Sequence, residues 1–510
     1  MLERVLERVP AAAVGRGGQS AGVPPYIVTA HAELQRAEGA LADQQYGEAL
    51  GAAYLFYEAQ RSGQLPPDNR VPWRKSAHTG DLVPGGWYDA GDYIKHSLTT
   101  AQAALFLAWS ALDFPAGLAM AGQGRYAVQE VVWAADYLVA CHLAPYRYVG
   151  LIGDPDIDHD FWGRPQEQPV GGGRRPAFIW TYETEAADLL GMVSAALASA
   201  SMLAKPVFPE KADLYLRTAG ALYRWAAAKP GLFAKSYKGY PEWLYGTSYY
   251  NDKLMLAASW LNRATGNSTY LYAAYRHWLA AGGRKGHRGQ WGGEINPYIS
   301  WDSMYGPAAV NLLRIAQRRG KAGVPGQREY ERFLDDVAEI WRRTGKWSLE
   351  HTPYGLRYAR WSKWGNLRYA ANAAFTMLLR AQTLPPDSRD RAALIKFARV
   401  QVDYSMGSTG RSYIVGFGRN PPRRVHHAAA SCPNPPAKCG WQQFETGAPN
   451  PQVLTGALVG GPAGPGDDTY SDRRNDFETN EVSIDYNAGL TAALAGLLAL
   501  DPDCCAAPPT

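Results

Sequence analysis

The sequence predicts an all-α architecture, and three observations support that fold class. Twelve stretches carry apolar residues at helical spacing. Strict alternation of apolar and polar residues, which is typical of a half-buried strand, is rare, and residues 411–418 are the exception. The chain also lacks the strand–helix rhythm that builds a parallel sheet. At 510 residues it is long enough to form one large domain.

The twelve helical runs follow one another along the chain, and several end at a glycine or proline. They cover residues 46–60, 101–112, 126–142, 183–203, 212–227, 252–264, 269–280, 304–315, 330–341, 366–381, 388–404 and 486–500. Two connections, 144–181 and 406–485, are far longer than ordinary loops between packed elements. Because both are dense in Trp, Tyr, His and Asp, we expect them to form the functional face.

The composition argues against nucleic-acid and membrane partners. A net charge of +5 is small for 510 residues, and no long run of Lys and Arg occurs. No run of 18 apolar residues occurs that would span a bilayer. The 17 Trp and 31 Tyr side chains suit the C–H faces of sugars, although core packing also uses such residues.

The two ends of the chain are expected to lie outside the main domain. Residues 1–44, which are rich in Gly and Pro between 15 and 25, are expected to be a poorly ordered extension, and 501–510 a tail that contains Cys and Pro. The first nine residues are charged and lack the apolar core of a signal peptide. A start that is wrongly assigned or later processed is the expectation, and the sequence does not choose between the two. Residues 45–500 are expected to form the functional domain.

Cysteine usage points to one covalent cross-link. Cys432 and Cys439 lie seven residues apart in a proline-rich loop, and we expect them to form a disulfide. One such bond fits an oxidising compartment, so an extracellular or secretory location is expected although no signal peptide is visible. No Cys/His grouping has zinc-ligand spacing, so no metal site is expected from these residues.

Two acidic segments near opposite ends of the chain carry the functional hypothesis. Asp89 and Asp92 lie in Gly85-Gly86-Trp87-Tyr88-Asp89-Ala90-Gly91-Asp92, where glycines allow the backbone to bend and present the carboxylates. A second acidic segment, 470–488, leads into the last helix. Each segment alone could be a solvated turn or a helix cap. Together they indicate a glycoside hydrolase, because cleavage of a glycosidic bond needs two carboxyl roles. Spacing alone does not choose between Glu478 and Glu481 as proton donor.

Several motifs resemble glycoside hydrolase family 9. The segment Tyr470-x-Asp472-x4-Phe477-x3-Glu481-x-Ser483-x3-Asn487-Ala488 is similar to one signature of that family, and residues 85–92 also match its pattern. Further matches are residues 69–74, 159–165, 301–302, 364–370 and 412–427, so that the resemblance covers about 45–500 in family order. Residues 450–462 and the Cys432/Cys439 pair are most similar to the animal and algal branch.

The resemblance implies a six-hairpin (α/α)6 barrel and an inverting endo-β-1,4-glucanase. Asp92 matches the general base that activates water, Asp89 its partner in holding that water, and Glu481 the general acid. Inversion places the acid and base carboxyls roughly 6.5–9.5 Å apart. The positions that match sugar-binding residues of the family are His159, Trp364, Arg368, Tyr369, His426 and Tyr486. A β-glucan substrate, a monomer and no organic cofactor are implied.

Two positions depart from the family pattern. The pattern reads His-x-Arg where this chain has His426-His427-Ala428, so a cationic contact to the substrate is missing. If alanine leaves a space that water fills, Ala428→Arg is expected to raise kcat/KM about tenfold or more without changing thermal stability. Many relatives hold structural calcium through Ser-Gly-x-x-Asp-Glu, which corresponds here to Ser248-Tyr249-Tyr250-Asn251-Asp252-Lys253. Because a lysine replaces a ligand carboxylate, calcium is not expected.

Two alternatives remain from the sequence. One is a relative that acts on chain ends or on another β-linked glycan. The other, from a different class of protein, is a glycan-binding relative with weak activity, which Ala428 would fit and the intact set of Asp89, Asp92 and Glu481 opposes. The sequence leaves the natural glucan and any module beyond Thr510 open.

Overall fold

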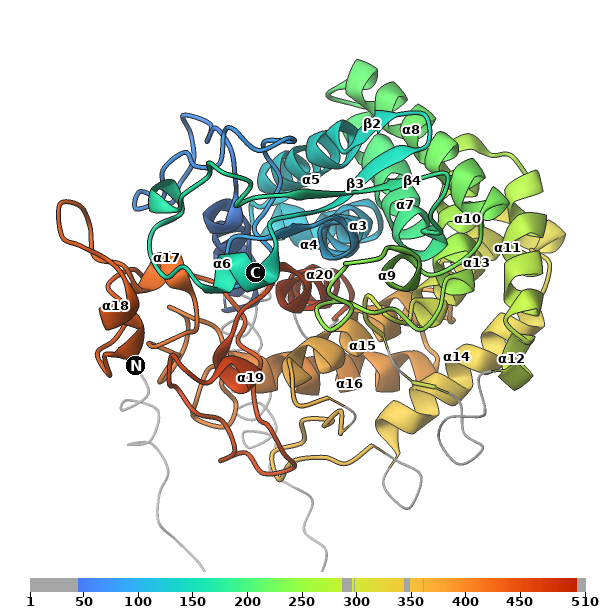
Figure 1. The fold of residues 1–510 in the computed structure, drawn as a ribbon. Coiled ribbons are helices and arrows are strands. Elements are labelled where there is room, and N and C mark those ends of the chain that lie inside the picture. The colour runs from blue at the N-terminus through green and yellow to red at the C-terminus, as the bar shows by residue number, and fades with distance from the viewer. Residues whose placement is uncertain (1–44, 287–295, 298, 344–348, 361, 502–510) are drawn as a thin grey trace, which may run out of the picture. The chain divides into compact units, whose positions relative to one another are not determined.

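The computed structural model describes residues 45–286, 296–297, 299–343, 349–360 and 362–501 (Figure 1). The expected extension at 1–44 and nearly all of the expected tail lie outside the described residues. The described residues between 45 and 501 form one compact unit. It contains the functional domain proposed from the sequence.

Six helices that are buried on nearly all sides form a closed ring. They are α3 (Ser97–Asp113), α7 (Ala187–Ala204), α10 (Asn251–Thr265), α13 (Tyr305–Arg319), α15 (Asn366–Ala381) and α20 (Ile484–Leu500). Each packs against the next in this order, and α20 closes the ring on α3 (Figure 1). Their small residues allow close approach: a Cβ at Gly489 of α20 would collide with the backbone of Asn372 on α15. This all-round burial explains why α3, α7 and α20 are apolar on every face.

Six further helices surround the ring, one before each inner helix in the chain. They are the helix at 45–60, α5 (Gly124–Ala140), α8 (Pro209–Ala228), α11 (Thr269–Ala280), α14 (Gln327–Arg342) and α16 (Arg389–Met406). The outer helices bury a single stripe; in α14 it includes Tyr330, Phe333, Val337 and Trp341, at helical spacing. The described chain thus forms six outer–inner hairpins, which confirms the all-α class predicted from the sequence pattern and the (α/α)6 barrel that the family resemblance implies.

The predicted helices are all present, and their ends differ by a few residues. The run predicted at 101–112 begins at Ser97, because the His96 side chain accepts a hydrogen bond from the backbone N–H of Leu98 and caps the helix. The run predicted from residue 183 begins only at Ala187. Short helices lie between the long ones: α4 (Pro115–Met120), α6 (Pro155–His159), α9 (Phe233–Ser236), α12 (Gly283–Gly286), α17 (Ala428–Ser431), α18 (Trp441–Glu445) and α19 (Phe477–Asn480), with 3-10 turns at Pro165–Glu167 and Gly320–Ala322.

The strand prediction was wrong: it missed a four-stranded sheet, and the strand that it expected at 411–418 is absent from the described structure. A four-stranded antiparallel sheet consists of β1 (Lys95–His96), β2 (His142–Ala144), β3 (Arg147–Ile152) and β4 (Ala177–Thr181). β3 pairs with the other three strands, and the sheet lies largely in the connection that we interpreted as a loop. Residues 411–418 form only a single bridge, Ile414–Leu458, because Gly416 and Gly418 adopt positive φ and turn the chain.

Helix α7 is long and apolar enough to cross a membrane by length and composition. Its 18 residues have a mean hydropathy of 1.5, and 89% of that window is buried inside the protein. This burial accounts for the composition, since α7 is an inner helix of the barrel and its apolar faces contact α3, α8 and α10.

Candidate active site

Three segments that are distant in the sequence are joined by backbone hydrogen bonds. The carbonyl of Asp89 accepts from the N–H of Ile484 at 2.9 Å, and the carbonyl of Gly91 accepts from the N–H of Ala428 at 2.8 Å. His426 and Glu481 form a parallel bridge. A Cβ at position 91 would collide with the carbonyl of His426, so this approach requires glycine. The two acidic segments predicted from the sequence therefore lie side by side.

Asp89 is buried and held from both sides. Its Oδ1 accepts from the Thr99 hydroxyl at the start of α3, and its Oδ2 accepts from the Tyr245 hydroxyl at 2.5 Å. Burial raises the pKa of Asp89 to about 8; the negative charge of Asp485 adds to this rise, and the two hydroxyl hydrogen bonds oppose it. Near neutral pH Asp89 is therefore largely protonated and poorly suited to take up a proton.

Asp92 lies at the more open end of the same turn. Its Oδ1 accepts from the N–H of Ile94 at 3.3 Å, and its Oδ2 pairs with His159 Nε2 at 2.9 Å. Partial burial lowers the pKa of His159, but the hydrogen bond and charge of Asp92 outweigh it and raise that pKa to about 9. His159 is thus cationic at neutral pH and holds Asp92. The sequence predicted a sugar-binding role for His159. In the structure His159 ends α6, and its ring pairs with the Asp92 carboxylate.

Glu481 follows α19 and faces the Asp89–Asp92 turn. The N–H of Gly91 donates to its Oε1 at 3.4 Å. Desolvation and the charge of Asp92 raise the pKa of Glu481 to about 8, while the Gly91 N–H and His159 oppose this rise. Glu481 is therefore protonated at neutral pH, as a general acid must be.

Behind these carboxyl groups lies a buried charged cluster. Arg368 of α15 pairs with Asp485 at 2.8 Å, and its guanidinium lies over the rings of Tyr369 and Tyr486 at 4.5 and 4.9 Å. Asp485 also accepts from the hydroxyl of Ser483 at 2.6 Å. Arg368, Tyr369 and Tyr486 are all buried in this structure, and their contact with sugar stays a prediction.

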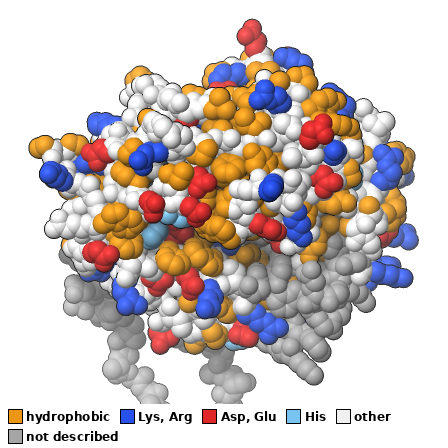
Figure 2. Space-filling model, in the orientation of Figure 1, with side chains coloured by type: hydrophobic (Ala, Val, Ile, Leu, Met, Phe, Trp, Pro, Cys, Tyr) orange, Lys and Arg blue, Asp and Glu red, His pale blue; other side chains and the backbone are white. Residues whose placement is uncertain are grey.

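Two other predicted ring residues, Trp364 and His426, are less buried than this cluster. Trp364 is half-exposed and stacks on Phe477, with ring centroids 5.1 Å apart. His426 packs edge-on against Trp162 at 5.2 Å, and its Nδ1 donates to the carbonyl of Arg474 at 2.7 Å, which leaves Nε2 as an acceptor. Burial lowers the pKa of His426. Figure 2 shows acidic and histidine side chains gathered in a hollow between hydrophobic side chains.

Sequence reasoning missed several residues of this site. Tyr245, whose hydroxyl contacts Asp89, belongs to a connection without a motif. Trp243 and Trp441 are 63% and 47% exposed, and they pack near His159 and Trp162 respectively. The density of aromatics in the long connections was the available signal, but it did not distinguish surface from core positions.

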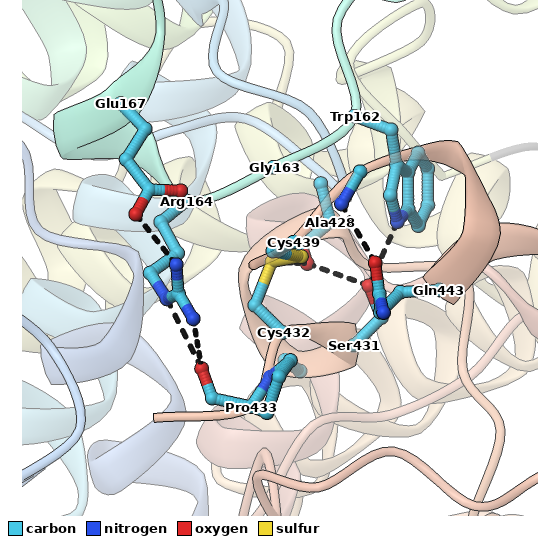
Figure 3. The surroundings of a disulfide bond; sticks show 12 residues. Trp162, Gly163, Arg164, Glu167, Ala428, Ser431, Cys432, Pro433, Cys439 and Gln443 are labelled. Atoms are coloured by element: carbon cyan, nitrogen blue, oxygen red, sulfur yellow. Dashed lines mark hydrogen bonds and ion pairs between the residues drawn. A yellow bond between two sulfur atoms is a disulfide. The ribbon is translucent and has the colours of Figure 1, made fainter. Parts of the chain in front are cut away.

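The disulfide between Cys432 and Cys439 is present, with Cα atoms 5.3 Å apart (Figure 3). Its loop is tied to the segment that carries the site. Trp162 Nε1 donates to the Ser431 hydroxyl at 2.8 Å, and Arg164 Nε donates to the carbonyl of Pro433 at 3.0 Å. The disulfide loop therefore holds the segment with Trp162 and Arg164 in place beside the site.

The expectation of a water-filled space beside Ala428 was wrong. Ala428 is only 2% exposed and belongs to a buried cluster with Tyr88, Tyr93, Trp162 and Ala429. An arginine side chain has to displace part of this cluster, so Ala428→Arg is expected to lower the free energy of unfolding by about 1–3 kcal/mol. Nothing in this packing favours a gain in turnover. Denaturant unfolding and kcat/KM of the variant check this, and an equally stable, faster variant would contradict it.

The pKa values also predict how activity depends on pH. Because the pKa of Glu481 is raised to about 8, its proton is present below that pH and is lost above it. We expect kcat/KM to fall by about tenfold per pH unit above pH 8.

The raised pKa of Glu481 also affects stability. Between the pKa of an ordinary glutamate and pH 8, the folded state binds more protons than the unfolded state. The contribution of Glu481 to stability is therefore lost as the pH rises through that window. A Glu481→Gln variant should therefore lose less thermal stability than the wild type between pH 5 and 9, as measured by melting curves.

Comparison with known proteins agrees with this geometry. The model of glycosyl hydrolase family 9 matches residues 46–494. Endoglucanase 5 of Arabidopsis thaliana is 34% identical over 494 residues, which span 91% of this chain and 76% of that protein. Endoglucanase 14 of the same plant is 33% identical, with 91% and 95% covered.

Solved structures give the same result. The endoglucanase of the termite Nasutitermes takasagoensis has a TM-score of 0.80 and 37% identity, with 89% of this chain and 99% of that chain covered. A cellulase of C. cellulolyticum in complex with cellobiose has a TM-score of 0.76 and 30% identity, with 88% and 97% covered. The likeness to an animal enzyme agrees with the branch that the sequence resembles. The chain therefore belongs to glycosyl hydrolase family 9 and is a glycoside hydrolase.

Proposed function

We propose that this chain hydrolyses internal β-1,4-glucosidic bonds of cellulose or a related β-glucan with inversion of configuration. The observation that carries the proposal is the approach of Glu481 to the Asp89–Asp92 turn, where the Gly91 N–H donates to its carboxyl group, and the raised pKa of Glu481 agrees with it. Inverting hydrolysis needs an acid for the leaving oxygen and a base for the attacking water. The relatives that are named endoglucanases support the choice of substrate.

In the proposed reaction Glu481 gives its proton to the glycosidic oxygen, and Asp92 accepts a proton from the water that attacks the anomeric carbon. Asp92 suits the base role because the raised pKa of Asp89, about 8, leaves that group largely protonated. Asp89, fixed by Thr99 and Tyr245, orients the water. His159 holds Asp92 in position through its ion pair.

Exposed aromatic rings next to these groups support a polymeric sugar substrate. Among the described residues, the half-exposed to exposed indoles are Trp243, Trp364 and Trp441. Rings presented in this way offer flat apolar faces to pyranose rings, which present C–H groups on theirs. His426, Arg368, Tyr369 and Tyr486 are proposed to support or contact the sugars nearest the cleaved bond.

The protein is proposed to act as a monomer outside the reducing cytosol. The disulfide between Cys432 and Cys439 supports this location, because such bonds persist in oxidising compartments.

The decisive experiment compares soluble carboxymethyl cellulose with cello-oligomers. An endo-acting enzyme lowers the viscosity of the polymer faster than it releases reducing ends, and the first anomer detected by NMR is the inverted one. Turnover of oligomers alone would favour an exo-acting enzyme, and binding without release would favour a glycan-binding relative. A retained anomer would contradict the proposed roles of Asp92 and Glu481.

A further inference from the structure

The ammonium group of Lys253 is fully buried at the start of α10, where a positive charge is unfavourable. The helix dipole disfavours cations in the first turn, so this lysine needs compensation from its surroundings. Its three N–H donors have three oxygen partners: Asp252 Oδ2 at 2.9 Å, the carbonyl of Tyr249 at 3.0 Å and the carbonyl of Asp302. The ammonium thus lies where oxygens from three residues converge.

Two of these oxygens, the carbonyls of Tyr249 and Asp302, come from connections that the lysine joins, and the third belongs to Asp252 in the first turn of α10. The segment 247–249 precedes α10, and Asp302 precedes α13. The Asp302 carboxylate also accepts from the N–H and hydroxyl of Ser248, at 2.5 and 3.0 Å. The Thr247 hydroxyl donates to the buried carboxylate of Asp188 on α7. Burial raises the pKa of Asp188, and the positive charge of Lys253 opposes this rise. A single positive charge therefore lies at the junction of both connections and α7.

The donor set resembles that of a hard cation, but the residue at its centre is itself a cation. Carboxylates and backbone carbonyls are the ligands that calcium prefers. A divalent ion at this point would meet the Lys253 ammonium at contact distance, and burial of the side chain leaves it no route to solvent. The residues present therefore do not fit calcium.

We propose that the Lys253 ammonium replaces a structural divalent cation, ties segment 247–249 to Asp302, and makes the stability of this protein independent of calcium. The same lysine is also a positioning residue for the active site. Tyr245 lies two residues before the tied segment, its ring packs edge-on against Trp301 at 5.0 Å, and its hydroxyl donates to Asp89. This second part rests on the proposed function, whereas the calcium independence does not.

Melting temperature measured with and without calcium tests the first part. The wild type is expected to show the same Tm in EDTA and in millimolar calcium, and no calcium binding by titration calorimetry. Lys253→Met should lower Tm by about 3–5 °C, because it leaves the buried Asp252 carboxylate without its cation and with only the N–H of Met304 as donor among the described residues, and calcium should not restore it. Lys253→Glu should melt lower still in EDTA and regain stability when calcium is added, because three carboxylates then surround the site.

Lys95 provides a matched control. It is equally buried, pairs with Asp81 at 2.9 Å and donates to the carbonyls of Val83 and Gly85 at 2.7 and 3.1 Å. Because Arg175 also pairs with Asp81, Lys95→Glu should be destabilised without a response to calcium. A wild-type Tm that falls in EDTA and recovers with calcium would overturn the proposal. So would a Lys253→Glu variant that ignores calcium, or a Lys95→Glu variant that responds equally.

Kinetics test the positioning role separately. Lys253→Met should lower kcat about tenfold with little change in KM, since the loss acts through the Tyr245–Asp89 hydrogen bond rather than through sugar contacts. Tyr245→Phe should reproduce that loss of kcat while keeping the calcium-independent Tm. Unchanged kcat in a folded Lys253→Met variant would refute the positioning role and leave the calcium result standing. If Lys253→Met does not fold, kcat of Lys253→Glu decides the same question: it should be lowered in EDTA and recover when calcium is added, and a kcat that is unchanged in EDTA would refute the positioning role.

Discussion

Replacing Glu481 by glutamine is expected to remove nearly all turnover of cellulose-type substrates while the fold and substrate binding stay intact. General acid catalysis contributes about 10²–10⁴-fold, and the amide has no proton to give. An aryl glycoside with a good leaving group should lose much less activity, because its leaving group needs no proton. The ratio of the two losses, measured as kcat/KM, is the diagnostic quantity.

Glu478 is the matched control for that experiment. It lies on α19, three residues before Glu481, and the sequence spacing alone did not separate the two candidates. Glu478→Gln is expected to leave both substrates unaffected. An equal loss on both kinds of substrate in Glu481→Gln, or a selective loss in Glu478→Gln, would remove Glu481 from the acid role.

Asp92→Asn is expected to be more damaging than Asp89→Asn. In the proposed reaction Asp92 takes the proton from water, which again contributes about 10²–10⁴-fold, whereas Asp89 only orients that water. Added azide should restore activity to Asp92→Ala and yield the inverted glycosyl azide. A readout independent of turnover is available in His159: its pKa, raised to about 9 by Asp92, should fall when the carboxylate is removed, as followed by NMR.

The outcome that reverses these assignments is equally clear. If Asp89→Asn is inactive and Asp92→Asn remains active, Asp89 is the base. The structure favours the present order because Asp89 is buried between two hydroxyl donors, while Asp92 lies at the more open end of the turn.

The sequence by itself predicted the helices of the barrel and the order of the catalytic segments. Inner helices such as α20 are apolar all round and outer helices such as α14 carry one stripe, so the periodicity of each run follows directly from its burial. The glycine-rich turn with Asp89 and the segment with Glu481 are local patterns whose chemistry is visible in the residue types.

Only the tertiary structure decided which distant groups meet these residues. Strand β1 has only two residues and forms because it pairs with β3. So short a strand has no sequence pattern from which it could be predicted. Tyr245 reaches Asp89 across 156 positions of sequence, and Ala428 faces a ring cluster instead of water. For Lys253 the sequence showed only a departure from the family's calcium pattern. The proposal that its ammonium takes the place of the ion depends on oxygens of Asp252 on α10 and of two connections, which meet only in the folded chain. Long-range contacts depend on how helices pack in the barrel, and that packing is a property of the whole chain rather than of any segment.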